Sequence, residues 1–172
     1  MLFEKDDKIF IERTRKALKQ HGRNLAVGEI SYDRTLFINA CVGLLLVPNA
    51  TIYDELPNIP IKEWGISADK IRMKDGDGNE LEELKTVQEV VRHLRNAIAH
   101  NRFDFNSGNN VESIPIDNIN FIDIHHGLNR RKRHHKEKVV AKFEVELTYE
   151  EFKQFIEKVA DFAIDHIQNK LR

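Results

Sequence analysis

Four polar residues in the middle of the chain, Arg92, Arg95, Asn96 and His100, are spaced so that a single helix would carry them. Successive helical residues turn by about 100°, so Arg92, Asn96 and His100, which are four residues apart, stack along one ridge. Arg95 then lies at the edge of the same polar side. Arginine presents a planar set of donors that matches a phosphate group, and histidine exchanges protons near neutral pH. Together these residue types favour chemistry on a phosphodiester.

The reaction that such a set could perform without a metal ion is the cleavage of RNA. A base removes the proton from a ribose 2′-hydroxyl, the oxygen attacks the adjacent phosphorus, and arginine stabilises the charge that develops. The same residues also fit a simpler interpretation as solvated surface groups. A histidine near the end of a helix can be there only because it favours the negative end of the helix dipole. The spacing alone leaves both interpretations open.

The arginine and the histidine do not lie on the same side of an ideal helix. Arg95 and His100 are five residues apart, which separates them by about 140° around the axis. Either the helix ends near Ala99 and turns His100 inward, or a second copy of the helix completes the site. Ala99 lies between Arg95 and the polar ridge, and its small side chain leaves room for another helix or a ligand.

The hydrophobic pattern predicts the helix that must hold this strip, from about residue 80 to 100. Its apolar residues recur at steps of three and four, which is typical of an amphipathic helix. They are Leu84, Val87, Val91, Leu94 and Ile98. Further helices are predicted over about 5–20 and 31–47, the second of which is apolar on nearly every side. Thr148 and Glu151 form a capping-box pattern that predicts a last helix over about 149–169.

Two segments have the pattern of extended chain. Residues 111–125 are rich in branched apolar side chains, and residues 139–147 alternate between apolar and charged ones, as in a half-buried strand. We expect them to pair as a hairpin over about 111–147. The predicted fold class is therefore mainly α. It is a single domain over residues 1–172, a helical bundle of about four main helices with a β-hairpin inserted before the C-terminal helix.

The stretch between residues 48 and 80 contains three of the four prolines, which excludes a long helix there. Its large apolar residues predict that it packs on the helices. They are Ile59, Ile61, Trp64 and Ile66. Residues 75–80 resemble the start of a calcium-binding loop, but Thr86 stands where a bidentate glutamate would be needed. We interpret residues 75–80 as an exposed turn.

The composition is that of a soluble globular protein. The net charge is -1, so any attraction to phosphate must come from a local patch. A single cysteine, Cys41, excludes a disulfide framework within one chain and is typical of a reducing compartment. The longest apolar run, residues 36–47, is far shorter than the roughly 20 residues that cross a bilayer. We therefore expect a cytoplasmic protein.

A basic tract stands at the tip of the expected hairpin. It includes Arg130, Arg131, Lys132 and Arg133. This tract fits either a contact with the RNA backbone or a solvated turn. Two histidine pairs, His125–His126 and His134–His135, raise the question of a metal site. Adjacent strand residues point to opposite faces, and the sequence shows no cysteine or carboxylate set that completes a site. We therefore expect no metal ion and no cofactor.

The segment Arg95-Asn96-Ala97-Ile98-Ala99-His100 matches the Arg-x4–6-His motif of the HEPN family (higher eukaryotes and prokaryotes nucleotide-binding). The motif stands at the end of a long predicted helix, where that family has it. The flanking segments, residues 44–48 (Leu-Leu-Leu-Val-Pro) and 61–66 (Ile-Lys-Glu-Trp-Gly-Ile), resemble a bacterial branch encoded on plasmids and chromosomes. The resemblance covers roughly residues 5–168.

This resemblance implies a metal-independent endoribonuclease used in toxin–antitoxin, CRISPR or phage-defence systems. Such proteins usually act as homodimers, with two motif helices that face each other across one cleft. By position in the motif, Arg95 and His100 are the catalytic pair and Asn96 is a supporting polar residue. Arg92 and Arg102 lie outside the motif, and we propose them only as phosphate contacts.

The resemblance also implies partners and leaves alternatives. An antitoxin such as a nucleotidyltransferase-like protein would restrain the nuclease. A HEPN domain that binds RNA or a nucleotide without cleaving it is one alternative, and a helical interaction protein is another. Phe103 and Phe105 fit either stacking on bases or packing in the segment that leaves the helix.

Overall fold

The computed structural model describes residues 2–24, 39–41, 43–45, 50–81, 85–106, 118–127 and 138–170. The helices are α1 (Leu2–Asn24), α3 (Ala50–Asp54), α4 (Val87–Ala99) and α5 (Tyr149–Lys170), with short 3-10 turns η2 (Ile61–Trp64) and η3 (Ala68–Lys70). The strands are β1 (Ile71–Asp75), β2 (Phe103–Asn106), β3 (Asn118–Gly127) and β4 (Lys138–Thr148). Among these segments, no helix has the length and apolar character to cross a membrane.

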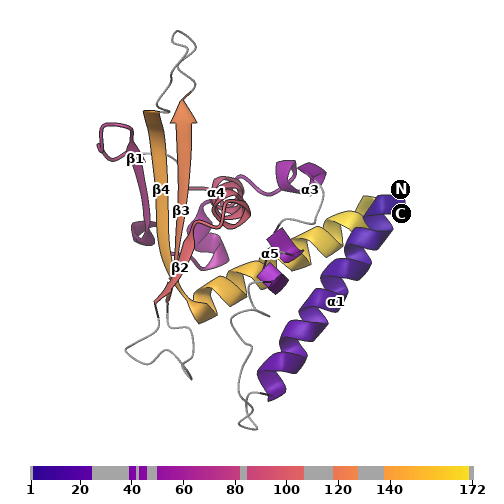
Figure 1. The fold of residues 1–172 in the computed structure, drawn as a ribbon. Helices are drawn as coiled ribbons and strands as arrows, with labels where there is room; N and C mark the ends of the chain where they lie inside the picture. The colour runs from indigo at the N-terminus through magenta and orange to yellow at the C-terminus, as the bar shows by residue number, and fades with distance from the viewer. Residues whose placement is uncertain are drawn as a thin grey trace.

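The strands form one antiparallel sheet in the order β1-β4-β3-β2 (Figure 1). The sequence led us to expect a single two-stranded hairpin, whereas the sheet contains two further strands, β1 and β2. β1 falls in the stretch expected to be irregular, and β2 directly follows the motif helix. Both are short, with β1 paired to the distant β4 and β2 paired to β3, the next strand along the chain. A four- or five-residue strand leaves too little pattern to be recognised from sequence. The expected hairpin tip and residues 111–117 lie outside the described residues.

Helix α4 lies against one face of the sheet, mainly over β3 (Figure 1). It begins at Val87 rather than near residue 80, because a capping box forms there. The Thr86 hydroxyl accepts the amide proton of Glu89, whose side chain returns to the Thr86 amide. Before this point the backbone pairs with residues 59–61: the Ile61 amide donates to the carbonyl of Lys85. Thr86, which forms a bridge with Pro60, is extended, and the helix begins only after it.

Helices α1 and α5 pack together, and α1 begins near the end of α5 (Figure 1). The Arg15 side chain joins them, since it lies 2.7 Å from Glu157 and 2.6 Å from Asp161. The residues of α5 that face the core recur at helical spacing. They are Phe152, Phe155, Ile156, Val159, Ala160, Ala163 and Ile167. Residues 39–41 and 43–45, the described part of the helix expected over 31–47, are helical.

The segment between α3 and β1 packs down on the helices, as its apolar residues indicate. Ile61 and Ile66 are fully buried, and the Trp64 ring meets the Phe155 ring edge-on with centroids 5.9 Å apart. Asp75 ends β1 and residues 76–80 form an exposed turn, in which the Asp75 carboxylate accepts the amide proton of Asn79.

The start of α5 offers a test of local stability. Glu151 accepts hydrogen bonds from the Thr148 amide and hydroxyl at 2.9 and 3.0 Å, and Lys70 lies 2.6 Å away. Burial raises the pKa of Glu151, but the bonds from Lys70 and Thr148 outweigh it and hold the pKa below its ordinary value. We expect Glu151→Gln to lower the free energy of unfolding by about 1 kcal/mol at neutral pH, as measured by urea denaturation.

The sign of the pH dependence follows from the depressed pKa. The stabilisation is present above the ordinary glutamate pKa of about 4.3 and is lost as the pH falls through the lower folded-state value. The difference between Glu151→Gln and the natural protein should therefore shrink below about pH 4. Glu150→Gln, on the exposed side of the same turn, is the control and should have little effect. A difference that persists unchanged in acid would contradict this account.

Candidate functional site

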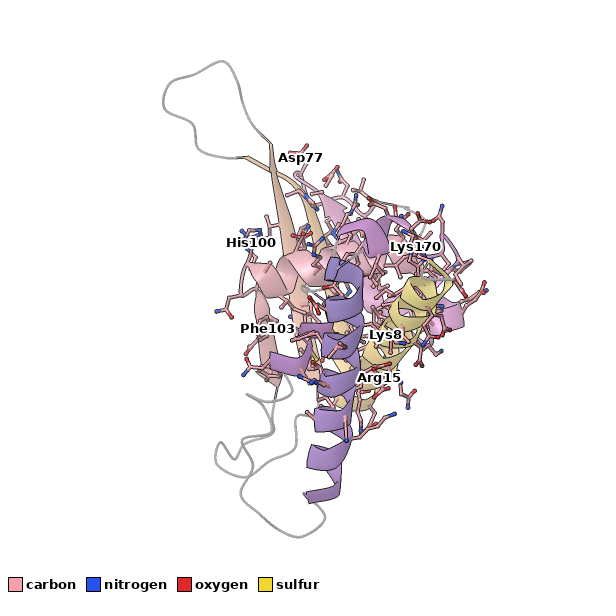
Figure 2. The ribbon with its side chains drawn as sticks, turned by 90° about the vertical axis from the view of Figure 1, so that its right-hand side faces the viewer. Lys8, Arg15, Asp77, His100, Phe103 and Lys170 are labelled. Atoms are coloured by element: carbon pink, nitrogen blue, oxygen red, sulfur yellow. The ribbon has the colours of Figure 1, made fainter. Side chains whose placement is uncertain are left out.

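The motif helix ends in a tight corner that fixes the position of His100. The amide of Arg102 donates to the carbonyl of Ala97 at 2.7 Å, and the amide of Asn101 donates to that of Ile98 at 3.0 Å. This is a Schellman motif, and its left-handed position is filled by Asn101 with φ 52°, a conformation that asparagine tolerates well. His100 is the C-cap and is exposed; Figure 2 shows it at the outer edge of the molecule. The helix thus ends at Ala99, but His100 does not turn inward.

Arg95 is half-buried and rests on an aromatic platform. Its guanidinium carbon lies 4.7 Å from the centre of the Tyr53 ring, which α3 supplies. Burial raises the pKa of Tyr53, and the positive charge of Arg95 offsets part of this increase. Among the described residues Arg95 has no ion pair or side-chain hydrogen bond, and none joins it to His100. The arginine is therefore held by its flat face, and its donors remain available to an anion.

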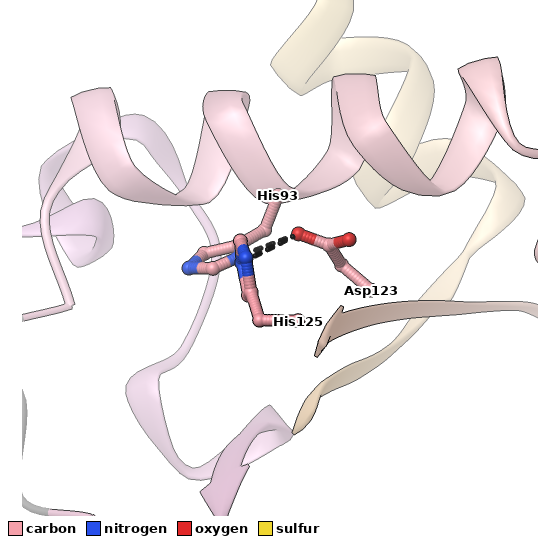
Figure 3. A group of neighbouring side chains, drawn as sticks. All are labelled: His93, Asp123 and His125. Carbon is pink, nitrogen blue, oxygen red and sulfur yellow. Dashed lines mark hydrogen bonds and ion pairs between the residues drawn. The ribbon is translucent and has the colours of Figure 1, made fainter. Parts of the chain in front are cut away.

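Asn96 is half-buried and is held by a carboxylate from β3. Its side-chain amide donates to Asp123 Oδ2 at 3.1 Å. The same oxygen lies 2.8 Å from His93 Nδ1 and 3.1 Å from His125 Nε2, as Figure 3 shows for the two histidines. Asp123 thus links α4 to β3 through its contacts with His93 and Asn96.

The environment of Asp123 keeps it ionised. Burial raises the pKa of this carboxyl, but hydrogen bonds from His93 and Asn96 and the charges of His125 and His93 outweigh burial, and the pKa lies below its ordinary value. His93 is 2% exposed and stacks on the Phe143 ring at 4.4 Å between centroids. Its Nε2 has no hydrogen-bond partner among the residues that the structure describes.

Sequence reasoning missed both His93 and Asp123, although each carried a signal. His93 follows Val90 and precedes Ala97 at steps of three and four, so it shares the buried face of α4. Asp123 continues the inward row of β3 after Ile119 and Phe121. A charged residue in an apolar row indicates a buried partner.

The residues outside the motif lie in different environments. Arg92 is exposed, whereas Arg102 is half-buried and donates to the carbonyl of Ile124 at 3.2 Å. Arg102 therefore holds the corner against β3 with part of its guanidinium. Phe103 and Phe105 are half-buried and pack on the core, which favours packing over base stacking. The basic tract, Arg130, Arg131, Lys132 and Arg133, lies outside the described residues.

A separate hollow of about 550 Å³ lies on the sheet and contains none of the motif residues. Its wall mixes acidic, basic and amide side chains, among them Lys70, Arg72, Asn120, Glu144 and Glu146. This mixture cancels any strong attraction to phosphate. The residues suited to phosphodiester chemistry are those at the end of α4, where one chain presents an available guanidinium and an exposed imidazole that are not in contact.

Comparison with known proteins bears on this geometry. The family model described as HEPN pEK499 p136 matches residues 3–170, nearly the whole chain. Neither the curated proteins nor the solved structures gave a match. The matched range includes the end of α4 and the segments that flank it. The chain therefore belongs to the HEPN family, in its pEK499 p136 branch.

Proposed function

We propose that this protein is a metal-independent endoribonuclease that acts as a homodimer in a toxin–antitoxin or phage-defence system. The observation that carries the proposal is the end of α4. Arg95 lies over Tyr53 with its donors unpaired among the described residues, and the capped corner presents His100 to solvent. Both residues of the family motif are therefore present and accessible.

The proposed reaction transfers a phosphoryl group within the RNA. An imidazole accepts the proton of a ribose 2′-hydroxyl, and the oxygen attacks the adjacent phosphorus. The bond to the 5′-oxygen breaks, that oxygen takes up a proton, and a 2′,3′-cyclic phosphate remains. Arg95 stabilises the negative charge on the non-bridging oxygens. Asn96, held by Asp123, is the supporting polar residue.

The geometry of a single chain favours a site shared between two copies. No described contact joins Arg95 to His100, and positions five residues apart are separated by about 140° around an ideal helix. Ala99 is exposed between them and offers little steric hindrance to a second α4. Two facing helices would place the partner's His100 near Arg95, with one imidazole available as base and another as acid. In this arrangement Arg92, Arg102 and the basic tract, residues 130–133, would contact the RNA backbone.

The test is incubation of the purified protein with mixed single-stranded and structured RNA in excess EDTA. We expect cleavage to persist in the chelator and the products to end in a 2′,3′-cyclic phosphate. Binding of RNA without cleavage would replace this proposal with a non-cleaving binding module. If the protein neither binds nor cleaves RNA, the remaining alternative is an interaction protein. Cleavage that EDTA abolishes would contradict metal independence. Light scattering at micromolar concentration should give the mass of a dimer, and a strict monomer would contradict the shared site.

The biological context can be tested separately through a restraining partner. A nuclease of this kind needs an antitoxin, and a nucleotidyltransferase-like protein encoded next to it would fit. Co-expression with that neighbour should suppress RNA cleavage if the two form a toxin–antitoxin pair.

A further inference from the structure

One cluster beside the motif brings together three side chains that commonly ligate metals. His93 comes from α4, and Asp123 and His125 come from β3 (Figure 3). One ligand atom from each lies within 4.8 Å of the others. It is the one group of three such residues found in the described part of the chain. The sequence raised His125 as a possible ligand but led us to expect no metal ion, because His93 lies thirty residues from Asp123 and the set was not apparent.

We propose that His93 Nδ1, the Asp123 carboxylate and His125 Nε2 bind a divalent transition-metal ion of the Zn²⁺ class. Two imidazole nitrogens and one carboxylate oxygen are ligands that Zn²⁺ prefers, and bonds of about 2.0–2.2 Å place tetrahedral ligands roughly 3.3 Å apart. The two nitrogens lie 2.8 and 3.1 Å from Asp123 Oδ2. Each nitrogen therefore needs to move away from this oxygen by only a few tenths of an ångström. Mg²⁺ and Ca²⁺ are disfavoured because they require more oxygen ligands.

The surroundings of the cluster resemble those of a built metal site. The side chains of His93 and Asp123 are 2% and 3% exposed, and stacking on Phe143 fixes the plane of the His93 ring. Asn96 donates to the same carboxylate oxygen, which is the kind of outer hydrogen bond that orients a metal-bound carboxylate. His125 is 43% exposed, so solvent reaches the cluster from its side. That side offers an entry route and a fourth position for water.

The consequence for the protein is a link between two elements. A metal ion held by His93 and His125 would join α4 to β3 directly beside Asn96. It would stabilise the folded chain, because the unfolded chain does not hold these three ligands together. This inference does not depend on RNA cleavage, which the proposed function places at Arg95 and His100 without a metal.

The experiment uses the whole chain after removal of metals with a chelator. Calorimetric titration with ZnCl₂ should show one site per chain, and CoCl₂ should give the visible absorption bands of a tetrahedral Co²⁺ complex. An excess of Zn²⁺ of about a hundred times Kd should raise Tm by about 5–10 °C. None of these readouts involves RNA, so their failure would leave the nuclease proposal untouched, and absence of cleavage would leave this one untouched.

Variants locate the site. His125→Ala changes a partly exposed residue and should weaken Zn²⁺ binding by more than the roughly 10–100-fold that the loss of an outer hydrogen bond costs. Asp123→Asn keeps the shape of the carboxylate and should also lose the Co²⁺ bands. The control is the double variant His134→Ala, His135→Ala, which should bind as the natural protein does. Failure of the natural protein to bind, full binding by His125→Ala, or loss of binding in the double variant would each overturn the proposal.

Discussion

Replacing His100 by alanine is expected to slow RNA cleavage by about 10²–10⁴-fold, the range in which a positioned acid or base contributes. His100 is exposed at the capped end of α4, so its loss should leave Tm nearly unchanged. Arg95→Ala is expected to slow cleavage by about 10²–10³-fold, because it removes charge stabilisation in the transition state. The measurement is the initial rate on a labelled RNA under saturating and limiting substrate.

Two controls separate chemistry from folding. Lys170→Ala removes an exposed cation at the far end of α5, well away from His100 in Figure 2, and should cleave at the natural rate. Tyr53→Phe removes a buried hydroxyl that has no partner among the described residues and keeps the ring beneath Arg95, so it should also remain active. Unchanged activity in both His100→Ala and Arg95→Ala would show that the site lies elsewhere.

Mixing the two inactive variants tests whether the site is shared. In a mixed dimer, Arg95 of one chain can still face the partner's His100, so one intact pairing is restored. We expect part of the activity to return when Arg95→Ala and His100→Ala chains are refolded together. If each chain used its own pair, mixing would restore nothing. That result would contradict the shared site while leaving the cleavage chemistry in place.

Asp123→Ala should produce the largest loss of stability, about 3–5 kcal/mol in the free energy of unfolding. Removing the carboxylate leaves His93 buried without the acceptor for its Nδ1 proton and frees the Asn96 amide. Asp123→Asn keeps one acceptor oxygen and should lose less. The measurement is urea denaturation at pH 7, with Asp165→Ala on the exposed side of α5 as control. A loss below about 0.5 kcal/mol, the usual range of surface substitutions, would contradict the role given to Asp123.

The part of the site that could be predicted from sequence is the part that one helix carries. Helical periodicity is local, so the apolar residues at steps of three and four predicted one helix for Arg95, Asn96 and His100 with its end near residue 100, and the helix ends at Ala99. The orientation of His100 could not be predicted in the same way. It depends on the left-handed residue Asn101 and on the return of the chain to β3, where the Ile122 amide donates to the carbonyl of Arg102.

The parts of the fold and site that the sequence did not predict depend on contacts between distant segments. The Asp123 cluster forms only when β3 lies under α4, and sequence separation gives no indication of that contact. β1 has a weak signal in the sequence, since apolar and charged residues alternate from Ile71 to Met73. In the structure Ile71 and Met73 are buried and Arg72 is exposed. Five residues of alternation among prolines and glycines are too short a signal unless the partner strand is known.

The strand order also has a consequence for the time course of folding. β3 and β4 are neighbours in sequence, whereas β1 pairs Ile71 with Val145 and must wait for most of the chain. The entropy of closing so long a loop makes early formation of this pairing unfavourable. Docking of β1 should therefore follow the rate-limiting barrier. Substitutions in β1 would then accelerate unfolding and leave the refolding rate nearly unchanged. During synthesis on a ribosome, β1 would remain unpaired until β4, in the C-terminal third of the chain, had emerged.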